Sequence, residues 1–263
     1  MRRIEQTFKR LKRKGQAALI PFIVAGDPDL ETTEALVIRM FESGADIIEL
    51  GVPYSDPLAD GPTIQAASQR ALQKGVKLED IFGLAKKLNK INPPLVLLSY
   101  FNPIFRYGLE AFAEECQRSG IDGVIVPDLP PEEAQPWIEE ARKFGVDTIF
   151  LASPTSPPGR IRLVSKVSSG FIYYVSLTGV TGAREKLPEE LKSGVRRIKE
   201  ESKKPVAVGF GISTPEQAKE VSRFADGVIV GSAVVRIVEE GGKNDNLVER
   251  VGDFVASLAA AIQ

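Results

Sequence analysis

Short apolar runs alternate along the chain with longer segments whose apolar residues recur at helical spacing. The runs have the length and composition of buried strands, and the longer segments have one apolar face, as amphipathic helices do. The first segment, residues 1–14, carries Ile4, Phe8 and Leu11 at this spacing. Strands are expected near residues 19–24, 47–50, 94–99, 124–126, 148–151, 171–175, 206–208 and 228–230.

This alternation of strands and helices predicts a (β/α)8 barrel with an extra N-terminal helix and short extra helices. No linker or change of composition divides residues 1–263, so we expect a single domain. A doubly wound parallel sheet is the alternative fold. Pro21 inside the first expected strand predicts a bulge there, because proline has no N–H to donate.

Aspartates recur at the junctions where a helix ends and an expected strand begins. They are Asp46, Asp122, Asp147 and Asp226, each directly after Gly-x or Ala. In a barrel, this face supports stability and not chemistry, so we interpret these aspartates as structural.

Composition and charge exclude several classes of function. Of the 263 residues, 43% are apolar, and the net charge of −1 gives no electrostatic reason to expect nucleic acid or anionic membrane as a partner. The absence of histidine excludes histidine-based metal sites, triads and proton shuttles. The single cysteine, Cys116, favours a reducing compartment, and no signal peptide or membrane span is evident, so we expect a cytoplasmic protein.

The most unusual stretch follows the second expected strand. Glu49 lies at the tip of an apolar strand, and the glycine- and proline-rich loop over residues 51–62 carries Asp56 and Asp60 back over that tip. A buried carboxylate is costly without a purpose, so Glu49 is a candidate for general acid–base catalysis. Taken alone, Asp60 is equally typical of a turn and Asp56 is more typical of one, while Tyr173 has the pattern of a barrel-interior side chain.

Glycine-rich stretches follow three neighbouring strands, at residues 179–182, 209–213 and 231–233. Each by itself is compatible with a tight turn. Together they would line up backbone N–H groups beside a short helix that is expected to begin at Ser232, a combination that binds phosphate. The sequence therefore predicts a phosphorylated substrate.

The order and spacing of these motifs carry a resemblance to a known family. Residues 49–65 (ELGVPYSDPLADGPTIQ) closely resemble the signature of the tryptophan synthase alpha subunit, as do the stretches PF at 21–22, AGDP at 25–28, TGVTG at 178–182, GFGIS at 209–213, PEQ at 215–217 and GSA at 231–233. The resemblance implies cleavage of indole-3-glycerol phosphate to indole and glyceraldehyde 3-phosphate. It also implies a beta-subunit partner in a heterotetramer, with pyridoxal phosphate only in that partner and no cofactor or metal in this chain.

The resemblance also implies roles for individual residues. Glu49 would be the acid–base group and Asp60 the carboxylate near the indole nitrogen, with Tyr173 near the substrate hydroxyl. The remaining substrate-binding positions would be Phe22, Leu98, Ile125, Thr181, Gly182, Phe210, Gly211, Ile229, Gly231 and Ser232. Leu177 departs from the family, where an arginine is often found, which leaves any ionic contact there in doubt.

Apolar and polar loop residues beside the expected active-site mouth are compatible with ordinary loop packing. With the resemblance, we interpret them as a docking surface for the beta subunit. These residues are Pro53, Asp56, Pro57, Asn102, Phe105, Asp128 and Pro130, of which 102–105 are expected in a loop.

Other activities fit the sequence less well. No lysine is expected at a strand tip, which disfavours a Schiff-base aldolase. A phosphosugar isomerase or epimerase on the same barrel is disfavoured by the lack of histidine. A catalytically idle regulatory subunit is disfavoured by the joint presence of Glu49 and Asp60.

Overall fold

Eight parallel strands close into a barrel in which each strand pairs with its neighbours in chain order, so the barrel prediction is confirmed. The computed structural model describes residues 2–91, 93–175, 189–209, 211–242 and 246–263. The strands are β1 (Ala18–Val24), β2 (Ile48–Gly51), β3 (Leu95–Leu98), β4 (Gly123–Ile125), β5 (Asp147–Ala152), β6 (Ile172–Val175), β7 (Val206–Gly209) and β8 (Gly227–Val230).

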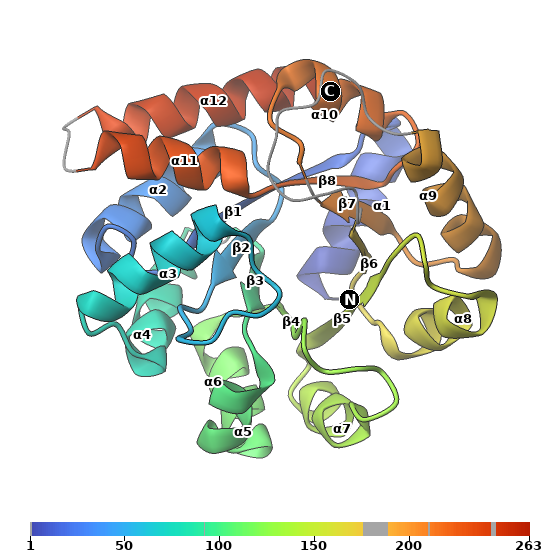
Figure 1. The fold of residues 1–263 in the computed structure, drawn as a ribbon, viewed down its shortest axis with the longest axis horizontal. Coiled ribbons are helices and arrows are strands. Elements are labelled where there is room, and N and C mark those ends of the chain that lie inside the picture. The colour runs from blue at the N-terminus through green and yellow to red at the C-terminus, as the bar shows by residue number, and fades with distance from the viewer. Residues whose placement is uncertain (1, 92, 176–188, 210, 243–245) are drawn as a thin grey trace.

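Helices surround the strands on all sides (Figure 1). They are α1 (Arg3–Lys14), α2 (Leu30–Glu42), α3 (Pro62–Gln73), α4 (Leu78–Leu88), α5 (Phe101–Tyr107), α6 (Leu109–Ser119), α7 (Gln135–Lys143), α8 (Pro158–Val167), α9 (Glu189–Glu201), α10 (Pro215–Ser222), α11 (Ser232–Gly241) and α12 (Leu247–Ile262). None of the described helices is long and apolar enough to cross a membrane.

Two local expectations were wrong. The segment 102–105, expected as a loop, lies inside the short helix α5. The bulge expected at Pro21 is also missing, because β1 runs as one strand from Ala18 to Val24. Pro21 is the last residue of β1 that pairs with β8, and pairing with β2 begins at the next residue. A missing N–H is tolerated at such a boundary.

The helix α1 closes the N-terminal end of the barrel. Its apolar face, formed by Ile4, Phe8 and Leu11, belongs to the same buried cluster as the inward side chains of the strands. The Phe8 ring lies 5.6 Å from that of Phe171, measured between centroids. Because this end is filled with apolar side chains, chemistry is restricted to the opposite end, where the strands terminate.

The junction aspartates are structural, as predicted. The side chains of Asp46, Asp122 and Asp226 each accept a hydrogen bond from a backbone N–H at the start of a neighbouring strand. Each also pairs with a basic side chain: the pairs are Arg10–Asp46, Arg3–Asp122 and Lys199–Asp226. These contacts fix the alignment of adjacent strands, and two of them tie α1 to the barrel.

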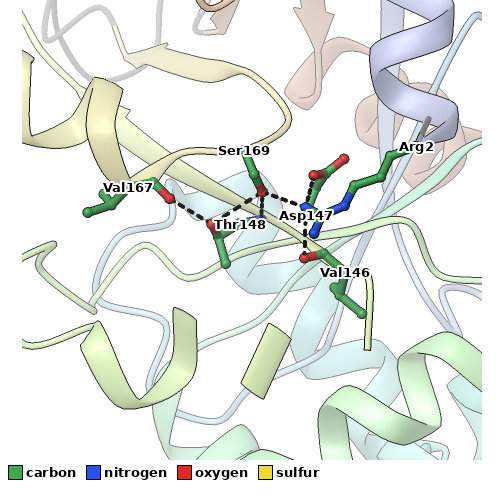
Figure 2. Close-up of polar contacts among 6 residues, drawn as sticks. All are labelled: Arg2, Val146, Asp147, Thr148, Val167 and Ser169. Carbon is green, nitrogen blue, oxygen red and sulfur yellow. Dashed lines mark hydrogen bonds and ion pairs between the residues drawn. The ribbon is translucent and has the colours of Figure 1, made fainter. Parts of the chain in front are cut away.

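The fourth junction aspartate is held differently. Figure 2 shows Arg2, which precedes α1, donating from Nη1 to the Asp147 carboxylate and to Ser169 Oγ, the latter at 3.0 Å. Ser169 Oγ in turn accepts a hydrogen bond from the Thr148 N–H at 2.9 Å. The Arg2 contact therefore ties the N-terminal segment to the starts of β5 and β6.

Candidate active site

Glu49, the second residue of β2, points into the barrel. It pairs in register with Phe22 on β1 and Val96 on β3, and it is 1% exposed. One carboxylate oxygen, Oε2, has no hydrogen-bond partner within the described part of the chain. Burial, with a smaller contribution from the charge of Asp60, raises the pKa of Glu49 from 4.5 to about 8. At neutral pH this side chain therefore carries a proton that it can donate.

Asp60 lies in the loop between β2 and α3, where several contacts fix it. Its carboxylate accepts a hydrogen bond of 3.1 Å from the Tyr100 hydroxyl, and its backbone N–H donates to the Pro57 carbonyl at 3.0 Å. Asp60 is more buried than a polar loop suggests, and burial raises its pKa to about 6, with the Tyr100 hydrogen bond acting in the opposite direction. Because this pKa is below 7, Asp60 is mainly ionised when Glu49 is mainly protonated.

Two strand-end glycines leave space for the aromatic residues of the site. A β-carbon at Gly51 would lie 2.6 Å from the Phe22 ring, and one at Gly209 would lie 2.4 Å from the Tyr173 hydroxyl. Tyr173 is partly buried, and its pKa lies well above the usual range, mainly because of burial, with the charge of Glu49 adding to it. This hydroxyl therefore stays protonated and able to donate a hydrogen bond.

The apolar positions implied by the resemblance lie on neighbouring strands. Leu98 on β3 pairs in register with Ile125 on β4, and Ile229 on β8 pairs with Gly209 on β7. Leu98, Ile125 and Ile229 all pack in the barrel-interior cluster. The barrel therefore presents an apolar wall next to the two carboxyl groups.

The expected phosphate site is partly described. Ser232 is the first residue of α11, as predicted, with Gly231 directly before it, and the first hydrogen bond of this helix runs from Val235 N to Gly231 O. The N–H groups of its first turn are consequently available to a ligand. After β7, Gly211 has a φ of +73°, a conformation that favours glycine. Thr181, Gly182 and Phe210, together with Leu177, lie outside the described residues.

The predicted docking residues differ in exposure. Asp56, Asn102, Phe105 and Asp128 are exposed and Pro57 and Pro130 are half-buried, all in segments that follow strand ends. Pro53 is buried, so it offers no surface to a partner and is omitted from the proposed interface. Leu58, which sequence reasoning did not select, is 84% exposed in the same loop as Asp60.

Two further contacts at this end of the barrel were missed from the sequence. Tyr100 reaches the Asp60 carboxylate, and Arg70 on α3 donates from Nε and Nη2 to both oxygens of the buried Asp27, at 2.8 and 2.9 Å. An aromatic residue next to a strand end was the only signal for Tyr100. Nothing in the local pattern linked Arg70 with Asp27. Among the described residues, no group of three or more potential ligand side chains is arranged to hold a metal ion.

The fold and the site together define the class: a (β/α)8-barrel enzyme with two carboxyl groups of unlike protonation, one on β2 and one in the loop that follows it. The family model of the tryptophan synthase alpha chain matches residues 8–263. The chain belongs to the tryptophan synthase alpha chain family.

Individual relatives agree with this assignment. The tryptophan synthase alpha chain of Geotalea uraniireducens is 51% identical over 264 residues, which covers 100% of this chain and 98% of that protein. That of a Thermoanaerobacter species is 51% identical, with 98% of each chain covered. The crystal structure of tryptophan synthase subunit alpha from Legionella pneumophila superposes with a TM-score of 0.93 at 41% identity, and covers 100% of this chain and 98% of that one.

Proposed function

We propose that Glu49 and Asp60 carry out the alpha reaction of tryptophan synthase in this chain. This reaction is the retro-aldol cleavage of indole-3-glycerol phosphate to indole and glyceraldehyde 3-phosphate, a lyase step of tryptophan biosynthesis. Family membership over nearly the whole chain supports the reaction. The observation that carries the residue assignment is the burial of Glu49 inside the barrel near the Asp60 carboxylate, which Tyr100 holds by a hydrogen bond. Burial raises the pKa values of the two groups to about 8 and about 6.

The chemistry needs a place for the electrons of the broken carbon–carbon bond, and the indole ring can supply it. Protonated Glu49 delivers its proton to C3 of the ring, which gives a cationic indolenine. The Glu49 carboxylate then takes the proton of the side-chain hydroxyl while the carbon–carbon bond breaks, the aldehyde forms and the bonding electrons return to the ring. Glu49 ends the cycle protonated, so the proton count balances.

The second carboxyl group acts through its charge. Ionised Asp60 accepts a hydrogen bond from the indole N–H and stabilises the positive charge that develops on the ring. The desolvated surroundings strengthen this interaction, because less water screens it. Tyr173, next to Gly209, is assigned to the substrate hydroxyl, and the apolar side chains of Phe22, Leu98 and Ile229 to the indole ring.

The phosphate is assigned to backbone N–H groups at the start of α11 and in the loop after β7. Gly211, Gly231 and Ser232 are the described residues of this site. A helix N-terminus favours a dianion through its dipole and its free N–H groups, so no basic side chain is required.

The partner and the location follow from the same family. We propose that the exposed residues Asp56, Asn102, Phe105 and Asp128, with Pro57 and Pro130, contact a beta subunit in a heterotetramer, so that indole passes on without entering water. Pyridoxal phosphate would belong to that subunit, and the alpha reaction would need no cofactor in this chain. The cytoplasm is the compartment in which we expect the complex.

The test is to add indole-3-glycerol phosphate to the purified chain, with and without a beta subunit, and to measure indole. Indole should form in both cases. Glu49→Gln and Asp60→Asn should each lower kcat by at least about 1,000-fold with the fold intact, whereas Glu110→Gln, at an exposed position on α6, should leave kcat unchanged. Full activity in either active-site variant would remove that residue from the mechanism.

A further inference from the structure

The hydroxyl of Tyr100 makes two hydrogen bonds to adjacent residues of the loop that carries Asp60. It donates to the Asp60 carboxylate at 3.1 Å and accepts from the Ala59 backbone N–H at 2.9 Å. One side-chain oxygen therefore holds both the carboxylate of Asp60 and the backbone next to it. The residues come from different elements, since Tyr100 follows β3 and Asp60 follows β2.

Tyr100 is itself held firmly. Its side chain is buried, and its ring stacks on that of Tyr54, with centroids 4.9 Å apart and an angle of 25° between the planes. The Tyr54 hydroxyl accepts a hydrogen bond of 3.3 Å from the Asn102 side chain on α5. A buried ring with a stacked neighbour has little rotameric freedom, so it can fix a loop residue.

This loop has little regular structure of its own. Between β2 and α3, the described backbone hydrogen bonds that begin and end within the loop run from Leu58 N to Asp56 O and from Asp60 N to Pro57 O. Neither of them orients the Asp60 carboxylate. Within the described part of the chain, the hydrogen bond to this carboxylate comes from Tyr100.

We propose that Tyr100 is a positioning residue for the cleavage reaction, which holds the Asp60 carboxylate in place beside Glu49 through the paired hydrogen bonds to Ala59 and Asp60. The inference rests on the proposed function, in which Asp60 faces the indole nitrogen. Tyr100 donates to the carboxylate and so favours its ionised form, against the effect of burial. Among the described residues, the other titratable groups around this pair are Glu49 on β2, Tyr54 in the loop after β2, Tyr173 on β6 and Asp128 in the loop after β4.

The test compares Tyr100→Phe with Tyr107→Phe in steady-state cleavage of indole-3-glycerol phosphate across a range of pH. Both variants lose one hydroxyl, but Tyr107 lies at the end of α5 and packs against Phe82 and Phe112. Tyr100→Phe should lower kcat by about 10-fold or more, with a smaller change in KM, because a hydrogen bond to a charged group is lost. It should also move the acid limb of the kcat/KM profile to higher pH, since Asp60 then ionises less readily. Tyr107→Phe should leave kcat, KM and the acid limb unchanged.

A double-variant comparison separates positioning from a general loss of structure. In an Asp60→Asn background, Tyr100→Phe should lower the residual kcat no further, because the group that it positions is already lost. The proposal would be overturned if Tyr100→Phe lowered kcat in the Asp60→Asn background by as large a factor as it does in the unaltered chain. It would also be overturned if the acid limb did not move in Tyr100→Phe. If Asp60→Asn is itself fully active, the assigned role of Asp60 fails and the Tyr100 proposal fails with it. If Asp60→Asn is inactive while Tyr100→Phe matches Tyr107→Phe, only the Tyr100 proposal fails.

Discussion

Gly209 at the end of β7 leaves the space that the Tyr173 side chain occupies. A β-carbon at position 209 would lie 2.4 Å from the Tyr173 hydroxyl oxygen and 2.6 Å from the ring. Tyr173 pairs in register with Ala207, which precedes Gly209 by one inward position on the same strand. The lack of a side chain at 209 therefore determines where a proposed substrate-binding hydroxyl lies.

Gly209→Ala is expected to displace Tyr173 and to lower kcat/KM for indole-3-glycerol phosphate by at least about 10-fold, because a misplaced contact in an active site is costly. Gly83→Ala is the matched control, since nothing lies within 4 Å of a β-carbon at that position on α4. The control should keep full activity and stabilise the chain by roughly 0.5–1 kcal/mol, as alanine is the better helix former. Unchanged kinetics in Gly209→Ala would mean that Tyr173 tolerates displacement or plays no part in binding the substrate.

The pH dependence of kcat/KM should be bell-shaped, with its maximum near neutral pH. The reaction needs Asp60 ionised, with a pKa of about 6, and Glu49 protonated, with a pKa of about 8, so activity should fall below the first value and above the second. The two limbs describe the interacting pair together. Activity that rises steadily to pH 10 would exclude protonated Glu49 as the proton donor.

Glu49 should also make stability depend on pH. Its pKa in the folded chain is about 8 against an ordinary 4.5, so the fold favours the protonated form. The contribution of protonated Glu49 to the free energy of unfolding is fully present below pH 4.5 and is lost as the pH rises through 8. This contribution is roughly 5 kcal/mol at most. Urea unfolding at pH 5 and pH 8.5 should show Glu49→Gln gaining stability relative to the unaltered chain at the higher pH. If the free energies of unfolding of the variant and the unaltered chain differed equally at pH 5 and pH 8.5, this would argue against a raised pKa of Glu49.

The Arg70–Asp27 pair should matter for stability. Asp27 is 2% exposed, and Arg70 contacts both of its carboxylate oxygens, so Arg70→Ala leaves a buried charge without this partner. We expect a loss of about 3 kcal/mol in the free energy of unfolding. Arg250→Ala, which breaks the more exposed pair with Glu240, should cost less than about 1 kcal/mol. Similar losses in both variants would show that burial of Asp27 is unimportant.

Phe105 provides a test of the proposed docking surface. Its side chain is 64% exposed on α5, so Phe105→Asp should leave the barrel stable while it raises the Kd for a beta subunit by at least about 10-fold. Ile91→Asp is the control, because Ile91 is 40% exposed and lies before β3, at the other end of the barrel. Titration of the two variants should separate them clearly. Equal Kd values would place the interface elsewhere.

The sequence pattern predicted the order and type of the elements well, because burial on one face leaves a direct trace in periodicity. The helix expected over residues 1–14 lies at Arg3–Lys14, and the strand expected near 228–230 lies at Gly227–Val230. The segment 102–105 was misread because its proline and few residues gave no helical period, although proline is well tolerated in the first turn of a helix such as α5.

The sequence by itself determined the barrel and the family to which the chain belongs, since apolar periodicity and motif order are local properties. Only the tertiary structure decided which distant residues meet, such as Tyr100 with Asp60 and Arg70 with Asp27. It also decided that Asp60 is buried enough to raise its pKa. The reason is that the exclusion of water around one side chain depends on neighbours from several strands and loops, and no local pattern records those neighbours.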